Sequence, residues 1–345
     1  YIKKKLIGLK MGIRAFFFSA ILMFTILKIS FAGDYADGNP AGGDGSEADP
    51  FKINDVADLQ KLMTTTTDLS SYFILTANID MSGQTADPIC AFNNAFRGNF
   101  NGQGYEIKDL LINNSSSNSQ ALFAFASNAV IENLNVINAE INGGNKTAIL
   151  IADNSNSDVN NCFVSGEISG GDNVGAICGS QSNAEIRNCS SSAIVSGDNF
   201  IGGLCGAIVM GSYLSKCYST ASISSTNNGG GLCGNNTFST IINCYSTGSV
   251  SGDENIGGFC GKVFYADIIN CHSVGYTSGS QSIGGFIGLN EGSCSCCFWN
   301  TQTSQRNNAV GTGSNSGISG LNNSQYRNEI SFSHCFVFPS IWVMS

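Results

Sequence analysis

A cysteine recurs about every 27 residues through the middle of the chain, and this regularity limits the fold more than any other feature. A second cysteine column follows the first, and each of its members lies 16 residues after a member of the first column. The first column is Cys162, Cys189, Cys217, Cys244, Cys271 and Cys297, and the second is Cys178, Cys205, Cys233 and Cys260. Repeats of this length are typical of solenoids, in which each copy buries its apolar face only against its neighbours. The sequence therefore predicts an elongated stack of copies.

Apolar and polar residues alternate within each copy with a period of two, as they do in β-strands. In the clearest copy, Asn243-Cys244-Tyr245 leads to Val250 and then to Ile256-Gly257-Gly258-Phe259-Cys260-Gly261. No part of the copy sustains the period of 3.6 that helical repeats require. We therefore predict an all-β fold, a right-handed parallel β-helix or similar β-solenoid with about six repeats of roughly 27 residues.

Two residue types indicate the corners of the coil. An asparagine precedes the first-column cysteine in most copies, where its tolerance of left-handed backbone and its amide hydrogen bonds to copies above and below suit a turn. These asparagines are Asn161, Asn188, Asn243 and Asn270. Glycine pairs such as Gly257-Gly258 are expected where backbones approach closely. The alternation leaves open whether the second cysteine column or the adjacent column, which includes Leu204 and Phe259, faces the core.

The residue after each first-column cysteine is expected to point toward solvent, and most of these residues are aromatic. Such a stripe is a candidate binding surface for sugar rings or for a protein partner. Stacking between neighbouring turns would explain the same stripe without any ligand. The candidate binding residues are Phe163, Tyr218, Tyr245, His272 and Phe298, with Trp299 beside them.

Fourteen cysteines on an exported chain would usually indicate disulfides. Stacked strands place equivalent residues about 4.8 Å apart, which is within the Cα range of a disulfide but loose for its Cβ range. Disulfides and ladders of buried thiols therefore stay open as alternatives for Cys162, Cys178, Cys189, Cys205, Cys217, Cys233, Cys244, Cys260 and Cys271. The tight cluster of Cys294, Cys296 and Cys297 has no histidine close enough for a familiar zinc pattern, so we expect no metal site.

The first residues of the chain have the pattern of a secretory signal peptide: basic residues, the apolar stretch Ala15 to Leu27, and a small-residue site that ends at Ala32. About 13 apolar residues are too few for a spanning helix, which needs roughly 20. We expect cleavage after Ala32, no membrane span beyond it, and a secreted or cell-surface location. Cleavage removes six basic and no acidic residues, so the formal charge moves from −9 to −15. An acidic chain without basic clusters is not expected to bind nucleic acid.

Acidic residues recur in the turn before the second strand of several copies, at Asp172, Asp198, Asp253 and Glu254. A calcium or catalytic ladder would use such residues, but acidic residues in Ser-Gly-Asp-Asn turns are more typical of solvated turns. The histidines His272 and His334 fit no zinc-protease pattern. We therefore predict no cofactor and no catalytic residues.

The Gly-Gly-Leu/Phe-Cys-Gly and Asn-Cys-Tyr-Ser-Thr-Gly segments resemble GLUG-motif repeats, which occur in secreted and surface bacterial proteins, many of them adhesin-like and some of them peptidases. A cysteine replaces the usual valine of that motif in four copies. The segments 43–51 and 96–104 resemble those that open such domains, and Cys297-Phe298-Trp299-Asn300-Thr301 resembles the closing motif. The resemblance covers about residues 41–330 and implies a fold and an exported location, but no activity.

We divide the chain into a signal peptide (1–32), an N-terminal capping segment with the first irregular rungs (33–128), a GLUG-type repeat array (129–303) and a C-terminal tail (304–345) whose departure from the family pattern suggests truncation. A short capping helix is expected over Asn54 to Leu62. The expected function is that of an exported, non-catalytic adhesion or interaction protein with a glycan or a surface protein as partner. Two alternatives stay open: a polysaccharide-active β-helix enzyme, either lyase or glycosidase, and a truncated fragment of a larger surface protein.

Overall fold

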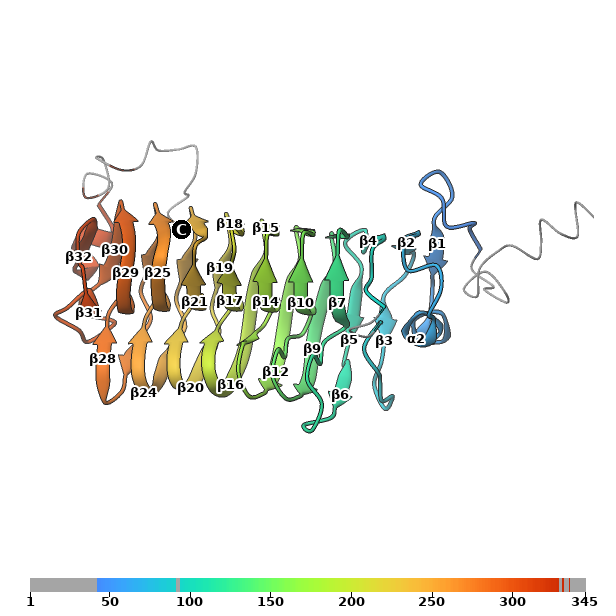
Figure 1. Cartoon of the computed structure of the whole chain (residues 1–345), viewed down its shortest axis with the longest axis horizontal. Helices are drawn as coiled ribbons and strands as arrows, with labels where there is room; N and C mark the ends of the chain where they lie inside the picture. Colours follow the sequence, from blue (N-terminus) through green and yellow to red (C-terminus); the bar gives the residue numbers. More distant parts are fainter. Residues whose placement is uncertain (1–41, 91–93, 329–330, 332–334, 336–345) are drawn as a thin grey trace, which may run out of the picture.

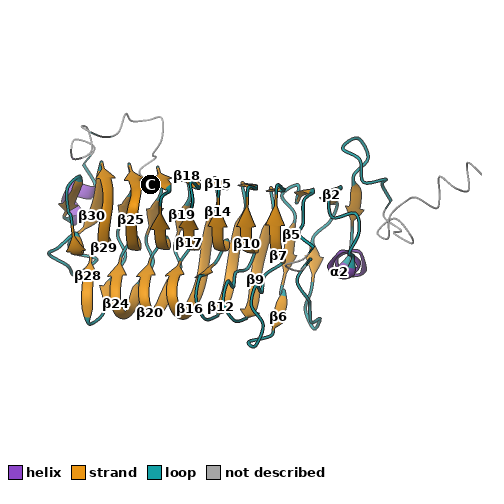
Figure 2. Ribbon diagram, viewed as in Figure 1, coloured by secondary structure: helices purple, strands orange, loops and turns teal. Residues whose placement is uncertain are grey.

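The computed structural model describes residues 42–90, 94–328, 331 and 335, and its parallel strands stack into a β-solenoid of about nine turns (Figures 1 and 2). The predicted fold class is therefore confirmed. The number of turns exceeds the predicted six repeats, because turns before residue 129 and after Cys297 complete the coil without the cysteine signature. The predicted signal peptide lies outside the described residues.

Four ladders of parallel strands form the walls of the coil, and two of them belong to one sheet. Ladder 1 contains β7 (Phe123–Ser127), β10 (Ile151–Ser155), β14 (Cys178–Ser182), β17 (Cys205–Val209), β21 (Cys233–Thr237), the first halves of β25 (Cys260–Ile269) and β29 (Ile287–Ser295), and β31 (Val310–Gly313). Ladder 2 contains β1 (Phe51–Ile53), β2 (Tyr72–Leu75), β4 (Asn99–Asn101), β8 (Val130–Glu132), β11 (Asp158–Asn160), β15 (Glu185–Arg187), β18 (Tyr213–Ser215), β22 (Thr240–Ile242) and the second halves of β25 and β29.

The other sheet holds ladders 3 and 4, which share the long strands β9 (Asn135–Asn142), β12 (Phe163–Ser169) and β16 (Ser190–Gly202). Ladder 3 is completed by β3 (Ile79–Asp80), β5 (Glu106–Lys108), β19 (Tyr218–Ser219), β23 (Tyr245–Ser246), β26 (His272–Ser273), β30 (Cys297–Asn300) and β32 (Ile318–Leu321). Ladder 4 is completed by β6 (Leu111–Asn113), β13 (Val174–Gly175), β20 (Ser222–Gly230), β24 (Val250–Gly257), β27 (Thr277–Ser278) and β28 (Gln281–Gly284).

A short helix closes the N-terminal end of the coil (Figure 1). Helix α2 (Val56–Thr64) begins after Asp55, whose side chain accepts a hydrogen bond from the backbone N–H of Asp58. Leu59 and Leu62 are fully buried against the first turns. The predicted capping helix is confirmed, two residues further along the chain. A single helical turn, α3 (Asn323–Tyr326), lies near the other end.

Both cysteine columns and the neighbouring apolar column face the interior, which settles the question that the alternation left open. Leu204 and Cys205 are adjacent, yet neither side chain is exposed. Both point inward because the chain turns a corner between them, so the two-residue period does not continue from one strand to the next. The glycine before this corner has the predicted role, since a Cβ on Gly202 would lie 1.9 Å from the carbonyl oxygen of Cys205.

The asparagine corners are confirmed in backbone and in side chain. The φ angles of the four predicted asparagines lie between 53° and 56°, in the left-handed region. The amide of Asn161 donates to Oδ1 of Asn133 at 2.8 Å, and that of Asn270 donates to Oδ1 of Asn243 at 3.3 Å. Lys216 occupies the equivalent corner of its turn with φ 54° and is exposed.

We expect Lys216→Asn to raise the free energy of unfolding by about 1 kcal/mol, because left-handed backbone is less favourable for lysine than for asparagine. Urea unfolding followed by circular dichroism would measure the change. Lys216→Gln is the matched control, since it removes the charge without the backbone preference. An equal gain in both variants would attribute the effect to charge.

One interior column of ladder 1 mixes polar and apolar side chains: Ala126, Asn154, Gln181, Ile208, Asn236, Val263 and Asn290. Asn236 lies between Ile208 and Val263 in register and is fully buried. Neither polar atom of its amide has a hydrogen-bond partner among the described residues. A buried amide without partners is destabilising, because it has lost its hydrogen bonds to water.

We therefore expect Asn236→Val to raise the free energy of unfolding by about 1–3 kcal/mol. Thermal unfolding would measure it, with Asn235→Val as the control at the neighbouring, half-buried position. A loss of stability in Asn236→Val alone would show that this amide forms hydrogen bonds in solution.

Candidate binding surfaces

The centre of the predicted aromatic stripe is a stack along ladder 3. The rings of Tyr218 and Tyr245 lie 4.9 Å apart at an angle of 3°, and those of Tyr245 and His272 lie 5.2 Å apart at 4°. These spacings are close to the distance between neighbouring strands, so the ring faces contact one another. Tyr218 is 36% exposed. The geometry of these rings matches the alternative of cross-turn stacking, and leaves mainly ring edges for solvent.

The two ends of the stripe differ from the prediction. Phe163 is half-buried and is separated from Tyr218 by Ser190, so it does not join the stack. Phe298 is only 5% exposed, because Leu321 and Tyr326 of the last turn cover it. Trp299 is 7% exposed and lies in the solenoid core. The expected exposure of Phe298 and Trp299 was therefore wrong: β32 pairs alongside β30 and hides one side chain, and the other points inward.

His272 is neutral at physiological pH. Its ring lies between those of Tyr245 and Tyr326, the latter at 6.1 Å and 61°. Burial lowers the pKa of His272 to about 4, because a buried imidazolium would lose its hydration. Burial raises the pKa of Tyr245 and of Tyr326. The stack therefore carries no charge near neutral pH.

The candidate cysteines form ladders of free thiols in the structure. The backbone N–H of Cys162 donates to Sγ of Cys189 at 3.4 Å, and the same contact recurs at the next three turns. Each of these first-column thiols also donates to the carbonyl oxygen two residues before it, as Cys217 does to Ser215 at 3.2 Å. In the second column the acceptor is the carbonyl two residues after, as for Cys233 and Asn235 at 3.1 Å. Burial raises the pKa of Cys205 and Cys244, so these thiols stay protonated. The sulfur thus provides the partner that a corner N–H needs.

One disulfide, which the sequence did not indicate, joins Cys296 and Cys335 with a Cα–Cα distance of 5.4 Å. Cys297, the neighbour of Cys296, points inward as a thiol and continues the first column. Within the part of the chain that the structure describes, no three His, Cys, Asp or Glu side chains are grouped to hold a metal ion.

The recurring acidic residues of the turns lie along one side of the coil. Asp198 and Asp253 border a shallow trough of about 640 Å³ that is otherwise lined by serine, glycine and threonine. Asp172 accepts a hydrogen bond from the amide of Asn199 in the next turn, at 3.0 Å. The acidic residues are thus distributed over several turns, and the trough is polar and open.

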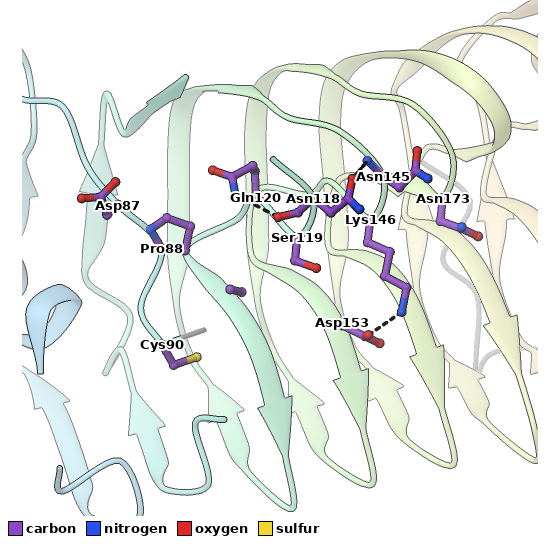
Figure 3. A pocket seen from close by; sticks show the side chains of 11 residues that line it. Asp87, Pro88, Cys90, Asn118, Ser119, Gln120, Asn145, Lys146, Asp153 and Asn173 are labelled. Carbon is purple, nitrogen blue, oxygen red and sulfur yellow. Dashed lines mark hydrogen bonds and ion pairs between the residues drawn. The ribbon is translucent and has the colours of Figure 1, made fainter. Parts of the chain in front are cut away.

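A polar pocket of about 660 Å³ lies over the first regular turns (Figure 3). Lys146 and Asp153 form an ion pair of 2.5 Å there, and Asn118, Gln120 and Asn145 also line the pocket. Asp87, Pro88 and Cys90 line the facing side. Asp87 and Asp153 are the two carboxylates among the lining residues. Sequence reasoning missed this pocket, although Asn118 and Asn145 are 27 residues apart and thus share a position in the repeat.

Large apolar side chains gather on the corner between ladders 1 and 2, which we call the corner patch and define as Met210, Phe238, Phe264 and Tyr265. Met210, Phe238 and Tyr265 are 62%, 56% and 68% exposed, and their φ angles are 56°, 51° and 44°. Phe264 contacts both neighbouring rings edge-on, at 5.8 Å from Phe238 and 4.4 Å from Tyr265. One feature of the sequence could have indicated this patch, namely the change of residue type at this corner along the coil. The preceding turns carry asparagine at the same corner, at Asn128, Asn156 and Asn183.

Comparison with known proteins confirms the resemblance that the repeats suggested. Residues 225–251 match the family described as the GLUG motif. Halomucin from Haloquadratum walsbyi is 33% identical over 132 residues, which is 34% of this chain and 1% of halomucin. The chain therefore spans a very small part of the curated relative that it matches.

Two solved structures share the fold. A candidate immunoglobulin A1 protease from Bacteroides ovatus superposes with a TM-score of 0.61 at 20% identity, over 85% of this chain and 90% of that one. A second structure, named IgA1 protease, gives a TM-score of 0.54 at 15% identity, over 85% of this chain and 25% of that one. At these identities the likeness concerns the fold alone. Among the described residues, the helices are too short or too polar to cross a membrane.

His272 should make folding depend on pH. Between pH 6.5 and 4 the unfolded chain binds a proton at this residue that the folded chain does not, so stability falls as the pH falls through this range. We expect His272→Tyr, which continues the stack with a ring that stays neutral, to reduce the loss between pH 7 and pH 4.5 by about 2 kcal/mol. Urea unfolding of both proteins at both pH values measures this difference. An unchanged pH dependence would contradict the assignment.

Proposed function

We propose that this chain is an exported, non-catalytic interaction module, an adhesion-type protein that presents binding surfaces on a rigid coil to a glycan or a surface protein. The corner patch carries this proposal. Seven large apolar side chains are exposed among the described residues, and three of them, Met210, Phe238 and Tyr265, occupy one corner of consecutive turns. A concentration of exposed apolar side chains on a soluble surface is typical of a binding site.

The scaffold suits this role because the patch needs little ordering before it binds. The backbone N–H of Gly211 donates to the carbonyl oxygen of Phe238 at 2.7 Å, and that of Phe238 donates to Phe264 at 3.1 Å. Such bonds from turn to turn hold the corner in one conformation. A preformed surface loses less conformational entropy on binding than a mobile loop does.

The similarity to halomucin and the GLUG motif support a role of this kind, and the immunoglobulin A1 protease names raise the alternative of an enzyme. The polar pocket gives that alternative a specific place, since Lys146 and Asp153 meet there opposite Asp87. A polysaccharide-active enzyme would use carboxylates across such a pocket. The proposal and this alternative predict different products when the protein meets a polysaccharide.

The test is to incubate the purified full chain with a panel of insoluble polysaccharides and immobilised matrix proteins, and to follow protein and sugar in the supernatant by mass spectrometry. We expect depletion of the protein by at least one member of the panel, with no sugar released. Released oligosaccharide that disappears in Asp153→Asn would overturn the non-catalytic assignment. No depletion by any member would contradict an interaction role.

A further inference from the structure

We propose that the corner patch is a binding site for a neutral polysaccharide, whose sugar rings pack against the exposed surfaces of Phe238 and Tyr265 on consecutive turns. This inference rests on the proposed interaction function and names its surface and its ligand class. It assigns binding to a surface other than the predicted stripe.

The first argument is the cost of placing large residues at this corner. Left-handed backbone costs roughly 1–2 kcal/mol for residues other than glycine, and less for asparagine. Phe238 and Tyr265 adopt this backbone where earlier turns carry Asn156 and Asn183. The rings recover little of this cost by burial, since more than half of each stays exposed. Folding alone therefore does not explain aromatic residues here.

The second argument is the contrast with the stack of Tyr218, Tyr245 and His272. Those rings lie face to face about one strand spacing apart, so the faces between them are covered by neighbouring rings. The rings of Phe238 and Tyr265 are also stacked, at 5° with centroids 5.7 Å apart, but both are far more exposed than Tyr218. Phe264 supports them edge-on from the end of the strand. The corner patch thus keeps aromatic surface available for a ligand.

The third argument concerns the ligand. The apolar C–H face of a sugar ring packs on an aromatic ring while its hydroxyls stay in water. The chain has a formal charge of −9, which disfavours a polyanion, and Lys262, the cation beside the patch, already lies 5.8 Å over Phe264. A specific protein interface buries about 800 Å² on each partner, which is more than four side chains along one corner present. A glycan chain fits a narrow row of exposed side chains on consecutive turns, here Met210, Phe238 and Tyr265.

Affinity electrophoresis of the full chain through gels that contain soluble neutral polysaccharides tests this site, with hydroxyethylcellulose, glycol chitin, xylan and laminarin as probes. The test variant is Phe238→Asn with Tyr265→Asn, which removes both rings and restores the residue found at the earlier corners, so the fold is kept. We expect at least a tenfold weaker apparent affinity for any polysaccharide that retards the native chain, with an unchanged or higher melting temperature. The matched control, Ile194→Asn with Tyr276→Asn, removes two other exposed apolar side chains and should bind normally.

The outcomes separate this inference from the function on which it rests. If polysaccharide binding survives in the test variant, the corner patch is not the site, although the proposed function stands. If the native chain binds only a matrix protein, or self-associates through the patch in sedimentation runs, the glycan inference is overturned and the interaction role remains. If the native chain binds no polysaccharide and no protein, both fail.

Discussion

The parallel hydrogen bonds between successive turns are the constraint on which the rest of this structure depends. Because each backbone group pairs with the turn above or below, a residue is aligned with its equivalents in neighbouring copies, as Cys178, Cys205 and Cys233 are in register. A side chain at a given position therefore lies against the equivalent side chains of the turns above and below, and it must be able to pack against them. Small thiols, stacked amides and parallel rings satisfy this requirement, whereas repeated buried charges would not.

The repeated features of the fold could be predicted from the sequence for the same reason. Because the same pattern recurs in several copies, chance variation in one copy does not hide it. The strand period, the asparagine corners and the inward thiols of the first column could therefore be predicted without coordinates. Features that depend on unrepeated segments could not. The burial of Phe298 follows from the closing turn that covers it, and the pocket needs Asp87 and Cys90 from an irregular segment. The alternation also failed where the chain bends between Leu204 and Cys205.

Aromatic residues have two distinct roles in this molecule, and their exposure separates them. In ladder 3 the rings of Tyr218 and Tyr245 stack on one another and stabilise the strand pairing beneath them. At the corner of ladders 1 and 2 the rings of Phe238 and Tyr265 remain open to solvent on a backbone that prefers other residues. Composition alone does not distinguish the two groups, because both contain tyrosine. The position within the turn decides which role a ring has.

The left-handed corners have a consequence for how such a chain changes over time. Met210, Phe238 and Tyr265 are exposed at their corner, and the strands on either side are held by backbone hydrogen bonds that do not involve these side chains. An exchange between asparagine, methionine and an aromatic residue at this point leaves the inward columns untouched. Duplication of one turn would copy the scaffold together with its corner, and the new corner would then be free to diverge. In this architecture the binding specificity of the surface can therefore change in one turn without any change in the residues that stabilise the fold.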